Sequence, residues 1–99
     1  MNLYRFPSNL QAQRNDTRRQ ALRAFDELLE AMAAINDEED GYIAGCCDER
    51  ALRAHVCREC WDVIQAVEGV LRQYANPTVK TAYMNVLERC RARGDYGED

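Results

Sequence analysis

Four acidic side chains stand in two pairs of equal spacing, and together they could bind a metal ion. Glu27 and Glu30 are three residues apart, and so are Glu59 and Asp62. Residues three apart in a helix lie on one side on neighbouring turns, so each pair directs its carboxylates toward one place. If the two helices pack together, the pairs converge. Four like charges repel unless cations or protons neutralise them, and carboxylate oxygens favour Mg²⁺, or else Mn²⁺.

Magnesium bound in this way also binds phosphates, which connects the acids to a phosphorylated substrate. The alternative for each pair is plain surface charge, because solvated helix faces are where Glu and Asp ordinarily lie. The packing of the helices that carry the acids therefore decides between a metal site and plain surface charge.

Three amphipathic helices are predicted around these acids. From about Asp16 to Ile35 apolar residues recur at spacings of three and four, and Asp16 or Thr17 caps the helix. An acidic run with two glycines predicts a loop over residues 36–45.

The second helix is predicted from Asp48 to about Tyr74, and the third follows Asn76, read as its cap, with Pro77 at its first position. One apolar stripe on the second helix comprises Leu52, Val56, Cys60, Val63, Val67, Val70 and Tyr74. The pattern predicts an all-α fold, an antiparallel helical bundle.

Size and charge narrow the class of protein. A chain of 99 residues buries only a modest core, so we expect dimerisation or higher oligomerisation, a homodimer or homotetramer, to complete the bundle. The net charge of −4 argues against nucleic acid as a partner. No membrane span or signal peptide is evident, which predicts a cytoplasmic protein.

The acids also resemble a family pattern. MazG-like proteins carry two helical motifs, EExxE and ExxD, and this chain reads Asp26-Glu-Leu-Leu-Glu30 and then Glu59-Cys-Trp-Asp62. Near the end, Arg89-Cys-Arg-Ala-Arg93-Gly-Asp-Tyr96 is similar to the family's Lys-Asn-x-x-Arg-Gly-aromatic segment, with Cys90 in place of Asn.

This resemblance implies a metal-dependent nucleoside triphosphate pyrophosphohydrolase, which splits the α–β phosphate linkage. Glu27, Glu30, Glu59 and Asp62 would then be the catalytic metal ligands, and Arg89 and Arg93 would contact the substrate phosphates. Residues 16–92 would form the MazG-like domain, after an arm or short helical segment over 1–15 and before a tail over 93–99.

Two other functions stay open. A helical interaction or regulatory protein could keep the scaffold with weak catalysis. A small zinc module could use Cys46, Cys47, Cys57 and Cys60, although Cys60 belongs to the predicted core stripe. His55 could assist a phosphate or bind metal, and Trp61 could lie in a subunit interface or stack on a base.

Overall fold

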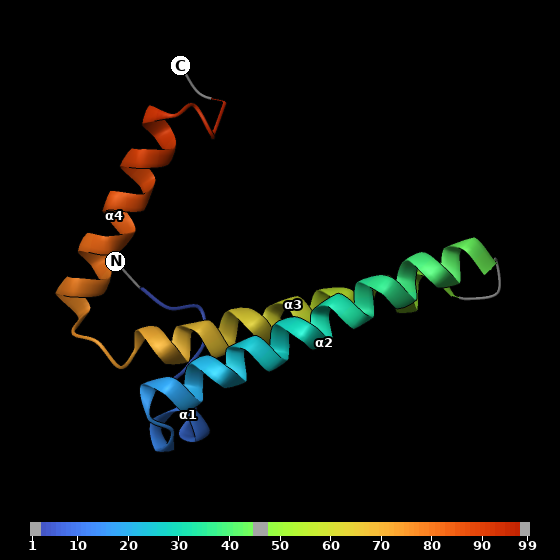
Figure 1. Ribbon diagram of the computed structural model, residues 1–99, viewed down its shortest axis with the longest axis horizontal. Helices are drawn as coiled ribbons and strands as arrows, with labels where there is room; N and C mark the ends of the chain where they lie inside the picture. Colours follow the sequence, from blue (N-terminus) through green and yellow to red (C-terminus); the bar gives the residue numbers. More distant parts are fainter. Residues whose placement is uncertain (1–2, 45–47, 98–99) are drawn as a thin grey trace.

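The protein is all-α, as predicted. The computed structural model describes residues 3–44 and 48–97, and these contain four helices and no strand. The helices are α1 (Leu10–Arg14), α2 (Thr17–Ala44), α3 (Glu49–Leu71) and α4 (Asn76–Ala92). Helices α2 and α3 lie side by side and antiparallel, and α4 leaves the end of this pair at an angle (Figure 1). The α2–α3 pair is thus the part of the predicted bundle that one chain builds.

Small residues line the seam between α2 and α3. Ala31 and Ala34 of α2 and Ala66 of α3 are almost fully buried. Near the start of α2, Gln20 is completely buried, and its side-chain amide donates a hydrogen bond to the Ala66 carbonyl oxygen of α3 at 3.0 Å. Gly69 leaves room for this amide, because a Cβ atom there would lie 2.6 Å from Gln20 Nε2. The seam is therefore narrow and holds one buried polar group with its partner.

The predicted loop over residues 36–45 is wrong as far as Ala44, because α2 continues through the acidic run and Gly41; position 45 lies outside the described residues. A glycine inside a helix costs about 1 kcal/mol relative to alanine. That local cost is offset by a helix that keeps packing against α3 along its length. Arg53 of α3 also pairs with Glu38 at 3.6 Å, across the stretch predicted to be irregular.

The predicted starts of α2 and α3 are confirmed, and each helix begins after an aspartate that caps it. Asp16 Oδ1 accepts from the backbone N–H of Arg19 at 2.7 Å and begins α2, and Asp48 accepts from Arg50 at 3.0 Å and begins α3. At α4 the N-cap is Ala75 rather than Asn76, so Pro77 moves one place into the first turn. Its missing N–H is harmless there as well, since first-turn N–H groups have no partner within the helix.

The N-terminal segment crosses the side of α3 that faces away from α2. The buried carboxylate of Glu68 accepts hydrogen bonds from the backbone N–H groups of Arg5 and Phe6 at 2.9–3.2 Å. Phe6 also meets the Trp61 ring edge-on, with the ring centres 6.0 Å apart. These contacts fasten the segment to α3 over about two turns.

The core of the single chain is small, and the molecule is spread out. The described buried apolar residues are Ala12, Ala31, Ala34, Ala66 and Val79. The molecule extends 49 × 43 × 21 Å with a radius of gyration of 16.8 Å, against about 13 Å for a compact domain of this length. Within the described residues, no helix combines the length and apolar character needed to cross a bilayer.

Candidate metal centre

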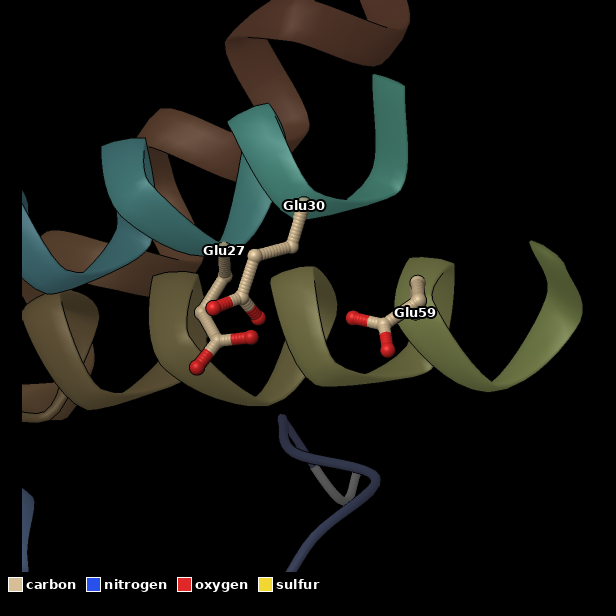
Figure 2. A group of neighbouring side chains, drawn as sticks. All are labelled: Glu27, Glu30 and Glu59. Atoms are coloured by element: carbon tan, nitrogen blue, oxygen red, sulfur yellow. The ribbon is translucent and has the colours of Figure 1, made fainter. Parts of the chain in front are cut away.

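The antiparallel packing of α2 and α3 brings together three of the four predicted acids. Glu27 and Glu30 project from α2 and Glu59 projects from α3, and one carboxylate oxygen of each lies within 4.8 Å of those of the other two. Figure 2 shows the three side chains converging over the seam between the helices. We call these three residues the acidic cluster. The described residues contain this one group of three or more His, Cys, Asp or Glu side chains with ligand atoms so close.

Asp62 stands at the edge of the acidic cluster. It is exposed and lies one turn after Glu59 on α3, and its charge reaches Glu27. Partial burial, then repulsion from Glu30 and from Asp62, raises the pKa of Glu27 above its ordinary value of 4.5. A hydrogen bond with Glu30 acts in the same direction. Glu27 therefore binds a proton more readily than an ordinary glutamate does.

Glu59 is the most constrained acid of the cluster. Only 17% of its side chain is exposed, and its Oε2 atom is buried without a hydrogen-bond partner among the described residues. A buried carboxylate oxygen without a partner is costly, so this atom fits a ligand bound at the cluster. All donors are hard oxygens from a flexible set of carboxylates, which suits Mg²⁺ or Mn²⁺ rather than zinc. The residues present thus fit a hard divalent cation.

Three basic side chains flank the acidic cluster. His55 lies one turn before Glu59, with its Nδ1 atom 3.8 Å from Glu59 Oε1, and Arg58 Nη2 lies 3.4 Å from the same ring nitrogen. On α2, Arg23 lies one turn before Glu27, and its charge lowers the pKa of that acid, against the larger effects that raise it. Of these residues the sequence analysis gave a role to His55 alone. His55 and Arg23 each precede a cluster acid by four residues, and this spacing is the signal that marks them.

The structure of one chain does not place Arg89 and Arg93 beside the acids. Both lie toward the far end of α4, which extends away from the α2–α3 pair (Figure 1). Arg93 forms an ion pair with Asp95 at 2.7 Å, and this interaction raises the pKa of the guanidinium. Their role in phosphate binding stays a prediction.

A cavity of about 620 Å³ lies away from the acids. It is lined by Leu3, Tyr4, Arg5, Glu68, Leu71, Val79 and Tyr83. Glu68 comes nine residues after Glu59 on α3, so the cavity opens on the opposite side of that helix. The acidic cluster is separate from this cavity; Glu30 is exposed to solvent, whereas Glu27 and Glu59 are half-buried.

The cysteines do not form a metal site within the described residues. Cys57 and Cys60 of α3 are both exposed, so the assignment of Cys60 to the core of the chain was wrong. Cys46 and Cys47, the other predicted zinc ligands, lie outside the described residues. Trp61 has partners within the chain, because Phe6 packs on its ring and the Arg5 guanidinium lies 5.7 Å from the ring centre. The ring is still 47% exposed, and its role in a subunit interface or in base stacking stays a prediction.

Comparison with protein-family models, with curated proteins and with solved structures found no match. The likeness to MazG-like proteins therefore rests on the motifs themselves and on the geometry that brings their acids together.

Proposed function

We propose that the protein is a metal-dependent nucleoside triphosphate pyrophosphohydrolase that releases pyrophosphate and a nucleoside monophosphate. The observation that carries the proposal is the convergence of Glu27, Glu30 and Glu59 from two helices within 4.8 Å. Each acidic pair alone is ordinary surface charge, whereas a shared site built from both motifs has a specific use. The type of reaction is inferred from the resemblance of these acidic motifs to those of MazG-like proteins.

The four acids would hold Mg²⁺, or Mn²⁺ in its place. A divalent cation there neutralises phosphate charge and withdraws electron density from a phosphoryl oxygen. Glu27 and Glu30 face Glu59 across the seam, so two helices fix the position of the ligands. His55 lies one turn before Glu59 on α3, with its Nδ1 atom 3.8 Å from Glu59 Oε1.

Positive charge near the cluster supports binding of a triphosphate. Arg23 and Arg58 flank the acids on α2 and α3, and guanidinium groups bind phosphate oxygens in a bidentate manner. Arg89 and Arg93 would join them only if α4 of a neighbouring copy approached the site. We place the reaction in the cytoplasm, where nucleoside triphosphates are formed and consumed.

The direct test is a panel of ribo- and deoxyribonucleoside triphosphates assayed with Mg²⁺ or Mn²⁺. We expect pyrophosphate and nucleoside monophosphate in equal amounts from at least one substrate. Glu59→Gln should reduce the rate by at least about 100-fold, because losing a ligand costs no less than losing a group that only orients one. Circular dichroism should show an unchanged helix content.

The matched control is Glu39→Gln, which removes one charge from an exposed position of α2 outside the cluster. It should leave the rate within about twofold of the original. Release of orthophosphate in place of pyrophosphate, or no metal-dependent hydrolysis across the panel, would refute the proposal.

A second candidate is a helical interaction protein with little catalysis. The observation that favours it is the position of Arg89 and Arg93, which one chain holds away from the acids (Figure 1). It predicts that the cluster binds Mn²⁺ but that no triphosphate is hydrolysed.

A further inference from the structure

Two cysteines stand on either side of a proposed metal ligand. The sequence there is Cys57-Arg58-Glu59-Cys60, and it lies within the continuous helix α3. Both thiols are exposed, whereas only 17% of the Glu59 side chain is exposed. The proposed reaction uses the Glu59 carboxylate and gives the two thiols no role.

The helix holds the two cysteines about one turn apart. The radius and rise of an α-helix place the Cα atoms of residues i and i+3 about 5 Å apart. This separation lies within the range of roughly 4.4–6.8 Å that disulfides span. The Cβ atoms of such a pair are about 5–6 Å apart, however, whereas a disulfide requires roughly 3.5–4.5 Å. Cys57 and Cys60 can therefore be joined only if the turn between them is distorted.

The turn that must be distorted carries Glu59. The backbone dihedral angles between the two cysteines include φ and ψ of both Arg58 and Glu59. Helical rotation of about 100° per residue directs Cys60 about 100° and Cys57 about 160° away from the Glu59 side chain, which points to the seam (Figure 2). A bridge between the thiols would therefore lie outside the acidic cluster and would move Glu59 through the backbone.

We propose that Cys57 and Cys60 form a reversible disulfide that displaces Glu59 from the acidic cluster and weakens metal binding there. This inference rests on the proposed function in taking the cluster as the metal site, and it does not require the triphosphate reaction. Strained or exposed disulfides are the ones most readily reduced. In a compartment that keeps thiols reduced, the pair therefore stays open and closes only under oxidising conditions.

The oxidant for this step is a small disulfide, RSSR. One cysteine, as its thiolate, attacks a sulfur atom of RSSR, forms a mixed disulfide and releases RS⁻. The second cysteine, also as its thiolate, attacks the cysteine sulfur of the mixed disulfide, which closes the Cys57–Cys60 bond and releases the second RS⁻. The two cysteines lose two electrons and RSSR gains them, and the two protons of the cysteine thiols end on the two RSH molecules. Excess thiol reverses both exchanges.

Peptide mapping of the folded full chain after treatment with glutathione disulfide tests the bond. Trypsin cleaves after Arg58, between the two cysteines, so fragments 54–58 and 59–72 stay together only if Cys57 and Cys60 are bridged. We expect the joined pair from protein that runs as a single chain on a non-reducing denaturing gel, and its separation by excess thiol. Separate fragments, whether unmodified, carrying glutathione or bonded to other cysteines, would overturn the proposal.

Calorimetric titration with Mn²⁺ alone measures the effect on the acidic cluster. Oxidation should raise the dissociation constant at least about tenfold, because disturbing the groups that orient a metal ligand costs about 10–100-fold in affinity. Reduction followed by desalting should restore the affinity. The matched controls Cys57→Ser and Cys60→Ser cannot form the bridge and should keep the affinity of the reduced chain after the same treatment. A bridged chain with unchanged Mn²⁺ affinity would overturn the proposal. A reduced chain that binds Mn²⁺ but releases no pyrophosphate would refute the proposed enzyme and leave this inference standing.

Discussion

Helices α2 and α3 build two contrasting surfaces. The acidic side carries the acidic cluster, and the apolar face carries the exposed residues Phe25, Leu28, Met32, Ile64, Val67 and Leu71. On the acidic side, Glu27 and Glu59 bring like charges close together, and one carboxylate oxygen of Glu59 is buried without a hydrogen-bond partner in the described part of the chain. On the apolar face, Leu28 and Val67 expose large side chains to water. The first deficit is electrostatic and is corrected by a cation; the second is hydrophobic and is corrected by a protein surface.

The difference shows how one pair of helices separates assembly from chemistry. A rotation of about 100° along each helix is enough to carry a residue from one side to the other. Substitutions on one side should therefore act on one property and spare the other. Conditions that change charge should affect the acidic side alone.

The largest effect should come from adding the cation. At a Mn²⁺ concentration 100 times its dissociation constant, the free energy of unfolding should rise by about 2.7 kcal/mol. Glu59→Gln removes a ligand and should lose most of this gain, whereas Leu10→Glu, which charges a 66% exposed leucine on α1, should retain it. Urea unfolding with and without the metal provides the measurement. An equal gain in the Glu59→Gln protein would mean that the metal binds outside the acidic cluster.

The acidic side could be predicted from sequence because its geometry follows from residue spacing, helix starts and the packing of consecutive helices. Spacing of three fixes the side of a helix, and the caps Asp16 and Asp48 fix where the helices begin. Antiparallel packing of consecutive helices then brings Glu27 opposite Glu59. What remained beyond reach was the position of Arg89, because the direction of α4 is set by the short turn before Ala75 and carries no periodic signal.

The apolar stripe of α3 shows where periodicity alone misleads. Val63 and Val70 are partly buried along the seam with α2, whereas Cys60 and Val67 of the same predicted stripe are exposed. An apolar arc that wide is broader than one neighbouring helix can cover. The extension of α2 through Gly41 was also missed, because a local helix breaker was outweighed by packing between distant residues.

A smaller change in stability should follow from a substitution in the seam between α2 and α3. Gln20→Ala leaves the Ala66 carbonyl oxygen and the Asn15 amide without their partner, and should lower the free energy of unfolding by roughly 2 kcal/mol. Neither the acids nor the apolar face is touched, so the mass of the assembly should not change. Chemical unfolding compared with Gln13→Ala, an exposed glutamine, measures the loss. A change below about 0.5 kcal/mol, typical of surface positions, would contradict the role of Gln20.

The smallest effect should be a dependence of stability on pH that belongs to the acidic side. The pKa of Glu27 is raised in the folded protein, so below neutrality the folded state binds more protons than the unfolded chain. Stability of the metal-free protein should therefore rise as the pH falls through the raised pKa toward the ordinary value of 4.5, and should be lost as the pH rises again. Urea unfolding in chelator between pH 7 and pH 5 measures this slope.

Glu27→Gln separates this dependence from other carboxyl groups, because the amide cannot titrate and relieves the repulsion at every pH. The variant should show a weaker slope and, near pH 7, a metal-free stability at least equal to that of the original chain. Metal reverses the argument: its ligands must be deprotonated, so saturating Mn²⁺ should make the stability gain grow as the pH rises. An identical slope in the Glu27→Gln protein would assign the pH dependence to groups outside the cluster, and the two sides of the α2–α3 pair would then no longer differ in their response to charge.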